Sequence, residues 1–180
     1  MSAELSTARL ALRIPEKRDA DAKAGQANDL EEVRYTARMR FPYGRSDAVD
    51  FIRAARAGAS NRRSAPFFIQ LKNGGALIGG VGLGLGAGRD AAELSYWIGR
   101  TYWNQGYASE AVAEILRFGF EALNLSVVCG NVVPDDGTSA RIMAKLGMTV
   151  VGHETSPAPA RDADQDVEIY EMTRDDWLNR

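Results

Sequence analysis

Seven segments of the chain carry the pattern typical of β-strands, in which apolar and polar residues alternate or β-branched and aromatic residues cluster. The first segment, "TARLALRIP", alternates in this way and stops at Pro15. Two further segments meet at Asn73-Gly74, a strong signal for a hairpin. The predicted strands cover residues 7–15, 65–75, 76–86, 91–99, 126–133, 148–156 and 166–174.

Helical spacing of apolar residues marks most of the remaining chain. The predicted helices cover residues 17–38, 47–58, 106–123 and 137–147. The first is broken around residues 25–29, while Ser46 is the expected N-cap of the second and Gly58 its end. The third carries an apolar stripe made of Ala108, Val112, Ile115, Gly119 and Ala122.

The order of these elements is strand, helices, three strands, helix, strand, helix and two strands. Clustered hairpins give antiparallel pairs, whereas a strand–helix–strand unit returns its second strand in parallel. The pattern therefore predicts an α+β fold with a mixed, mostly antiparallel central sheet of about seven strands. We expect a single domain over residues 1–180, because the length is ordinary for one domain and no repeat or linker divides it.

The composition is that of an ordinary globular protein, with 45% apolar residues and a formal net charge of −2. This charge argues against a dedicated nucleic-acid binder, which normally carries a basic excess. No segment reaches the ~20 apolar residues of a membrane span, and the N-terminal residues lack the apolar core of a signal peptide. We therefore expect a cytoplasmic protein with no nucleic-acid or membrane partner.

Cys129 and His153 are the only residues of their kinds. One cysteine excludes an internal disulfide, and one of each leaves too few ligands for a zinc site, so no metal is expected. One cysteine and one histidine are enough for a Cys–His nucleophilic pair. The apolar run around Cys129 nevertheless favours a small buried side chain, and His153 falls in a predicted strand.

Gly106 opens the third predicted helix although glycine is a poor helix former. Small residues at a helix start leave room for an anion to approach free backbone N–H groups. Gly106 and Ala108 therefore indicate an anion site, which the N–H groups of Gln105, Tyr107 and Ser109 would complete. The alternative is that Gly106 only turns the chain into the helix.

Two other stretches invite a ligand-binding interpretation. Residues 82–87, "GLGLGA", match a variant of the dinucleotide fingerprint, but that site needs a helix to follow and here a strand follows. A glycine-rich strand is the better interpretation. Asp135, Asp136 and Thr138 are ordinary caps for the next helix, whereas Ser139, one turn in, could offer its hydroxyl to a ligand.

"AELSYWIGRTYWNQGYASEA" followed by "NVVPDDGTSARIMAKLGM" resembles the GNAT acetyltransferase superfamily, in particular its RimJ/RimL-like branch. That branch typically has a Glu-containing strand, then W-x-x-G-Y-A-T-E-A, then P-x-N-x-x-S followed by K-L-G-F. The likeness extends over nearly the whole chain and is specific for the superfamily rather than for a substrate. It implies a GNAT-like sheet with helices on both faces, acetyl-CoA as co-substrate and a primary amine as acceptor.

The resemblance also implies roles for individual residues. Glu93 matches the family carboxylate that acts as general base, the alternative being a solvated residue at the strand end. Ser139 is the expected proton donor to the departing thiolate, and Tyr107 is a weaker candidate. A backbone N–H near Trp97 or Ile98 would stabilise the oxyanion. Coenzyme contacts are expected from Tyr96, Trp97, Ile98, Gln105, Gly106, Tyr107, Ala108, Ser109, Asp136 and Ser139.

Two positions depart from the family pattern. Asp136 stands where Asn is usual, and a carboxylate donates no N–H bond and repels phosphates. Residue 105 is Gln, where many relatives carry Lys or Arg. Both departures predict weaker coenzyme affinity, and they keep open a second function, that of a non-catalytic module that binds acyl-CoA.

The acceptor is expected over the helices between Lys17 and Gly58. Two segments would flank it: "RFPYG" and a flexible loop, "SPAPARDADQD", whose acidic residues would attract a cationic amine. A protein α-amine and a small-molecule amine are equally compatible with these features. The oligomeric state stays open, a homodimer included.

Overall fold

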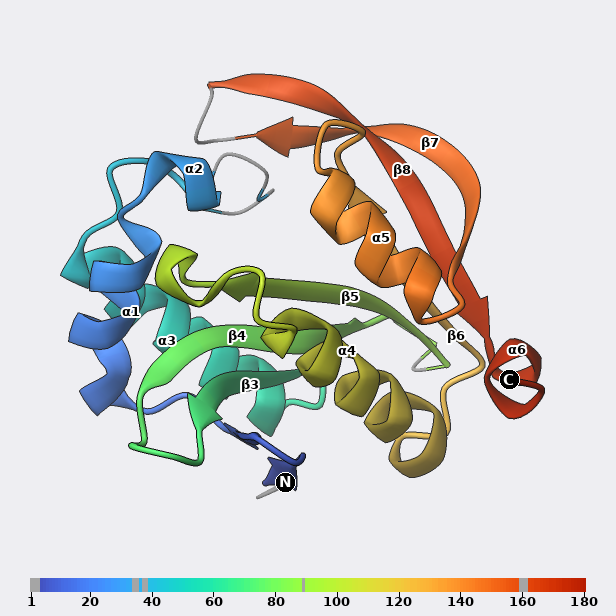
Figure 1. Ribbon diagram of the computed structural model, residues 1–180, viewed down its shortest axis with the longest axis horizontal. Coiled ribbons are helices and arrows are strands. Elements are labelled where there is room, and N and C mark those ends of the chain that lie inside the picture. The colour runs from blue at the N-terminus through green and yellow to red at the C-terminus, as the bar shows by residue number, and fades with distance from the viewer. Residues whose placement is uncertain (1–3, 34–35, 37–38, 89, 159–161) are drawn as a thin grey trace.

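The computed structural model describes residues 4–33, 36, 39–88, 90–158 and 162–180, and its central feature is an open sheet (Figure 1). Eight strands in the described residues follow the order β1-β2-β3-β4-β5-β6-β8-β7. Neighbouring strands are antiparallel except β5 and β6, which run in parallel. The strands are β1 (Leu5–Ser6), β2 (Leu10–Arg13), β3 (Ser64–Leu71), β4 (Leu77–Leu85), β5 (Ala91–Ile98), β6 (Val127–Val132), β7 (Thr149–Ala158) and β8 (Ala163–Thr173).

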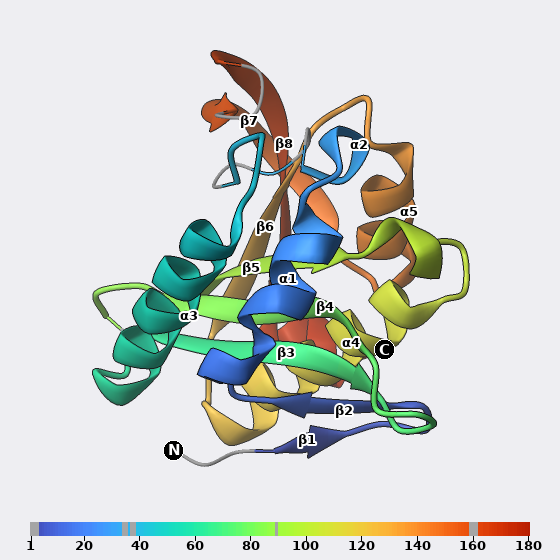
Figure 2. The same cartoon turned by 90° about the vertical axis from the view of Figure 1, so that its left-hand side faces the viewer.

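Helices cover both faces of this sheet, as the resemblance implied (Figure 2). The α-helices are α1 (Ala20–Ala27), α2 (Leu30–Val33), α3 (Arg45–Ser60), α4 (Tyr107–Arg117), α5 (Gly137–Lys145) and α6 (Arg174–Leu178). Short 3₁₀ turns lie at Lys17–Asp19 and Arg100–Tyr102. One apolar cluster joins α1 and α3 to their face of the sheet, and the other joins α4 and α5 to the opposite face. None of the helices in the described ranges is both long and apolar enough to cross a bilayer.

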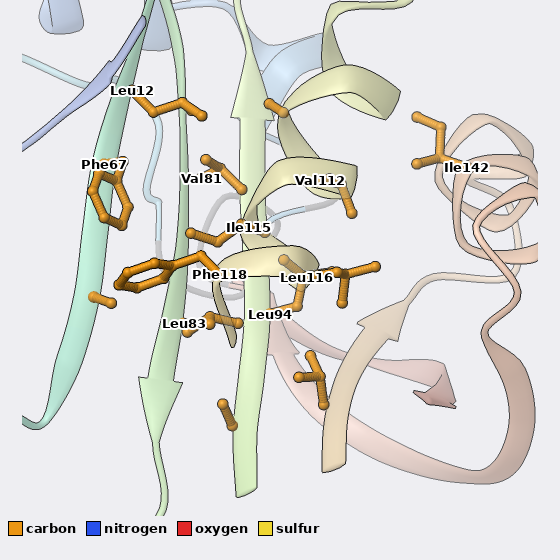
Figure 3. Packing of buried hydrophobic residues seen from close by; sticks show 14 of the residues in the cluster. Leu12, Phe67, Val81, Leu83, Leu94, Val112, Ile115, Leu116, Phe118 and Ile142 are labelled. Atoms are coloured by element: carbon orange, nitrogen blue, oxygen red, sulfur yellow. The ribbon is translucent and has the colours of Figure 1, made fainter. Parts of the chain in front are cut away.

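The larger core lies between α4 and the strands β3, β4 and β5 (Figure 3). Val112, Ile115 and Leu116 project from one side of α4 and are fully buried. They meet Leu83 and Leu94 on the sheet in the same cluster. Burial of each such side chain contributes about 1.5–3 kcal/mol, so this stripe fixes α4 firmly on the sheet.

The parallel pair β5–β6 is the feature that shapes the site. Its register covers only three residue pairs and ends at Glu93, which faces Cys129. β5 continues to Ile98 and β6 to Val132 without further pairing between them. The two strands therefore separate beyond Glu93 and leave a gap between them.

Several element boundaries differ from the sequence predictions. The sheet has eight strands rather than about seven, because Leu5–Ser6 pairs with Leu12 and Ala11 in a two-residue strand too short for any periodicity. Gly44, not Ser46, is the N-cap of α3, so the helix begins two residues earlier than predicted. The Asp47 carboxylate accepts the Gly44 N–H at 2.9 Å and stabilises this start. This helix runs past Gly58 to Ser60.

Two further predictions need correction. The third helix stops at Arg117 and continues as a π-helical turn, Phe118–Ala122, which leaves Ala122 exposed. The segment "SPAPARDADQD" is largely strand: its two ends extend β7 and β8 into a long hairpin (Figure 1), and residues 159–161 lie outside the described ranges. The segment has the composition of a loop, but its two halves pair with each other as β7 and β8, with Pro157 opposite Asp164.

Candidate active site

The turn at Gly106 places the start of α4 at the open end of β5. Gly106 is the N-cap of α4 and has a φ of 78°, in the left-handed region that favours glycine. The backbone conformation therefore explains why a poor helix former stands here. The N–H groups of the first turn have no acceptor within the helix, and Tyr107, Ala108 and Ser109 line a cavity with Gly106.

This cavity, of about 880 Å³, extends along β5 between the starts of α4 and α5. It gathers residues that are far apart in the sequence. Of the predicted site residues it is lined by Glu93, Tyr96, Trp97, Ile98, Gly106, Tyr107, Ala108, Ser109, Asp136 and Ser139. Gln105 does not line it, and its side-chain Nε2 donates to the Thr101 carbonyl at 3.1 Å.

A hydrogen bond bridges the gap beside β5. The Tyr96 hydroxyl donates to Ser139 Oγ at 2.7 Å, which links β5 to the first turn of α5. Burial, opposed by this hydrogen bond and helped by the Asp136 charge, raises the pKa of Tyr96 to about 12. Tyr96 therefore stays protonated at neutral pH and holds Ser139 as an acceptor, which leaves the Ser139 proton available to another group.

Asp136 caps α5. Its carboxylate accepts the Ser139 N–H at 3.1 Å, the ordinary N-cap interaction that the sequence also allowed. This hydrogen bond holds the Asp136 carboxylate at the N-terminus of α5. It also fixes the backbone of Ser139 at the edge of the cavity.

Glu93 lies where β5 and β6 part, and its half-buried side chain faces the cavity. Its neighbour in the parallel register, Cys129, is half-buried and donates its thiol weakly to the Ala92 carbonyl at 3.5 Å. Burial, together with the negative charges of Glu93 and Glu171, raises the pKa of the Cys129 thiol. This thiol is therefore protonated at neutral pH, which removes it as a nucleophile. His153 lies in β7, as predicted.

The opposite wall of the cavity comes from the helices around α1 and α3, where the sequence placed the acceptor. It carries aromatic side chains, Tyr43 and Phe51 beside Trp97, and the acidic residues Asp47 and Asp50. The acidic lining on this side thus comes from α2, with Glu31, and from α3. The hairpin that was expected to supply it contributes Ser156, Gln165 and Val167.

Lys23 was not anticipated from the sequence. It is fully buried behind this wall, and its Nζ lies 4.2 Å from the Trp97 ring centroid, 4.3 Å from that of Phe51 and 4.9 Å from that of Tyr43. These distances are those of cation–π contacts. A lysine in a segment that reads as an ordinary exposed helix gives no signal of this burial.

Comparison with known proteins agrees with the architecture. Residues 9–149 match the family model described as an acetyltransferase (GNAT) domain. The N-acetyltransferase p20 of Bacillus licheniformis is 31% identical over 149 residues, which cover 82% of this chain and 83% of that protein. These matches confirm the expected enzyme class, an N-acetyltransferase.

Solved structures share the fold. A GNAT-family acetyltransferase from Bacillus anthracis superimposes with a TM-score of 0.83 at 23% identity, covering 96% of this chain and 99% of the other. Mycobacterium smegmatis RimJ, solved in complex with CoA-disulfide, gives a TM-score of 0.82 at 22% identity and covers 99% of this chain and 88% of its own. The chain belongs to the GNAT acetyltransferase family.

Proposed function

We propose that this protein transfers the acetyl group of acetyl-CoA directly to a primary amine. The observation that carries the proposal is the single cavity that joins the left-handed turn at Gly106, the open edge of β5 beyond Glu93 and the Tyr96–Ser139 pair. One end of this cavity suits a diphosphate and the middle suits an extended chain. The far end, with its aromatic and acidic wall, suits an amine.

The coenzyme would bind along this path. Its diphosphate would accept hydrogen bonds from the N–H groups at the start of α4, where the helix dipole adds about half a positive charge. Its pantetheine arm would lie in the gap between β5 and β6. There, Tyr96, Trp97 and Ile98 have main-chain groups that β6 does not pair within the described residues. The arm would thus bind β5 much as an added strand does.

The chemistry would begin with the amine. A primary amine has a pKa near ~10, so most of it is protonated at neutral pH and a base must remove a proton. Glu93 would do this through a water molecule. The amine nitrogen would then attack the thioester carbon, and a backbone N–H of Trp97 or Ile98 would stabilise the oxyanion.

The attacking nitrogen would lose its second proton to solvent, and collapse of the tetrahedral intermediate would break the C–S bond and release the coenzyme thiolate. A thiol of pKa near ~8.5 is already a good leaving group, so proton donation assists this step rather than enabling it. Ser139 would donate its proton to the sulfur. Tyr96, which already donates to Ser139 Oγ, would then pass its own proton on. No covalent enzyme intermediate is required, which agrees with the raised pKa of the Cys129 thiol.

The wall around Tyr43, Phe51 and Asp50 supports an acceptor that combines a cationic nitrogen with an apolar flank. Protein α-amines and small-molecule amines both meet this description. A panel that contains both classes is therefore the right assay, with thiol release as readout.

The test begins with acetyl-CoA binding, measured as thermal stabilisation. If the coenzyme binds only the folded state, a free concentration of about 100 times its Kd raises the free energy of unfolding by about 2.7 kcal/mol. Turnover on the amine panel that Glu93→Gln lowers about 100-fold at neutral pH, while coenzyme still binds, would support the enzyme. Tight coenzyme binding without transfer to any amine would instead support the non-catalytic acyl-CoA-binding module. Absence of coenzyme binding would overturn both.

A further inference from the structure

Arg9 joins the N-terminal hairpin to the first turn of α4. It lies between β1 and β2, 101 residues from Glu110 in the sequence, and its Nε donates to Glu110 Oε2 at 2.6 Å. The Arg9 backbone N–H donates to Glu110 Oε1 at 2.9 Å. The Arg9 guanidinium carbon also lies 4.5 Å from the Tyr107 ring centroid, the distance of a cation–π contact.

A further contact reaches the backbone of the turn itself. Arg9 Nη1 donates to the Gln105 carbonyl at 2.9 Å. In a trans peptide the C=O and the following N–H point in opposite directions. Holding the Gln105 carbonyl on Arg9 therefore directs the Gly106 N–H away from Arg9. The cavity lining agrees, because it includes Gly106 but neither Gln105 nor Arg9.

The same guanidinium balances a negative charge in the first turn of α4. Glu110 lies in the first turn of α4, where an unbalanced carboxylate would repel a diphosphate. Burial acts to raise the pKa of Glu110, but hydrogen bonds from the Thr7 hydroxyl at 2.5 Å and from Arg9 outweigh it and lower that pKa. Glu110 is therefore charged at neutral pH, and Arg9 is its cationic partner.

We propose that Arg9 is a positioning residue of the coenzyme site: its guanidinium holds the Gln105 carbonyl and neutralises Glu110, so that the Gly106 N–H faces the coenzyme diphosphate. The proposal rests on the proposed function, because it assumes that acetyl-CoA binds at this turn. It accounts for a chain that carries Gln at residue 105, since Arg9 reaches the turn from the connection between β1 and β2.

The experiment compares two acetyl donors, acetyl-CoA and S-acetyl-pantetheine, which lacks the diphosphate. For Arg9→Gln, loss of charge-assisted hydrogen bonds at the turn should raise the KM for acetyl-CoA and the Kd for CoA by about tenfold. The kcat at saturating acetyl-CoA and the KM for S-acetyl-pantetheine should stay within about twofold. A residue that only stabilised the fold would affect both donors equally.

Arg117→Gln is the matched control. Arg117 pairs with Glu114 of α4 at 2.6 Å, the distance at which Arg9 pairs with Glu110 of the same helix. The two arginines are similarly exposed, 45% for Arg117 and 47% for Arg9, but Arg117 lies at the far end of α4. It should leave both KM values unchanged. Arg9→Lys serves if the glutamine variant does not fold. Its ammonium is one point charge without the fork by which Arg9 uses Nε for Glu110 and Nη1 for the Gln105 carbonyl, so the KM for acetyl-CoA should still rise about threefold.

Three outcomes would contradict the proposal. An unchanged Kd for CoA in Arg9→Gln, or in Arg9→Lys if only that variant folds, would show that Arg9 does not act on the diphosphate. An equal rise in KM for both donors would assign Arg9 a structural role alone. A wild-type protein that binds no CoA would overturn the proposed function as well, which separates the two failures.

Discussion

The Tyr96 hydroxyl donates a 2.7 Å hydrogen bond to Ser139 Oγ, across the gap that opens where β5 and β6 stop pairing. The direction of this bond matters for the chemistry. Because Ser139 accepts from Tyr96, its own proton can point to a third group, and the serine can recover a proton from the tyrosine. The pair therefore has the arrangement of a two-step proton relay.

Tyr96→Phe should lower kcat by about fivefold to tenfold while the KM for acetyl-CoA changes little, because the relay acts after the coenzyme is bound. The effect is modest since a thiolate leaves readily. The double variant with Ser139→Ala should be no slower than Ser139→Ala alone, because the two side chains act as one unit. Steady-state kinetics at saturating acceptor measures both effects.

Tyr170→Phe is the control for that experiment, because it removes a tyrosine hydroxyl that donates to Glu168 at 3.2 Å in β8 rather than to Ser139. It should leave kcat unchanged. Fully additive losses for Tyr96→Phe and Ser139→Ala would show that the two residues act separately.

Glu93→Gln should lower kcat by about 100-fold at neutral pH, the scale of a lost general base, while the Kd for CoA is preserved. The loss should shrink as the pH approaches the amine pKa of ~10, because the acceptor then loses its proton without help. Rates measured from pH 7 to pH 10 test this. Glu121→Gln, which removes a carboxylate in the π-helical turn after α4, is the control, and a pH-independent loss at Glu93 would contradict the base role.

The strands and helices were largely predictable because their signals are local. Alternation along β5 places Leu94 and Ile98 on one face and Trp97 on the other, and the two apolar clusters divide in the same way. Gly106 stood out because a poor helix former opened an amphipathic helix, and its positive φ supplies the reason.

Relationships between distant segments were not predictable in the same way. Alternation gives the face of Tyr96 but not its reach to Ser139, which depends on how far β5 and β6 separate. Arg9 meets Gln105 only because β2 and α4 meet in the folded protein. The N-cap of α3 was misplaced because Ser46 and Gly44 are both acceptable caps, and the Asp47 side chain decides between them.

Gly106→Ala should destabilise the protein by about 1–2 kcal/mol, because alanine is strained at a φ of 78°. It should also raise the Kd for CoA, since the N–H groups of the turn would be displaced. Thermal unfolding and coenzyme titration measure the two effects.

Gly25→Ala is the matched control for that substitution. Gly25 lies inside α1 with no atom within 4 Å of the new methyl group, so helix propensity alone should act and stabilise by about 0.4–1 kcal/mol. If both variants destabilised the protein equally, the left-handed conformation at Gly106 would not be the cause.

The bidentate pair of Arg13 with Asp19 makes stability depend on acidic pH. Its two hydrogen bonds are 2.8 Å and 2.7 Å, and the carboxylate is almost fully buried. Burial acts to raise the pKa of Asp19, but the Arg13 hydrogen bond, the Glu16 N–H and the guanidinium charge outweigh it and lower that pKa.

A lowered pKa in the folded state contributes stability above the unfolded pKa of about 3.9, and this stability is lost as the pH falls through the folded value. Asp19→Asn should therefore lower the Tm clearly at pH 6, and its difference from the wild type should shrink below about pH 4. The exposed pair of Asp21 with Arg45 offers the control, because Asp21→Asn should change the Tm little at any pH. A Tm difference for Asp19→Asn that stayed constant from pH 6 to pH 3 would show that the contribution of Asp19 does not come from its charge.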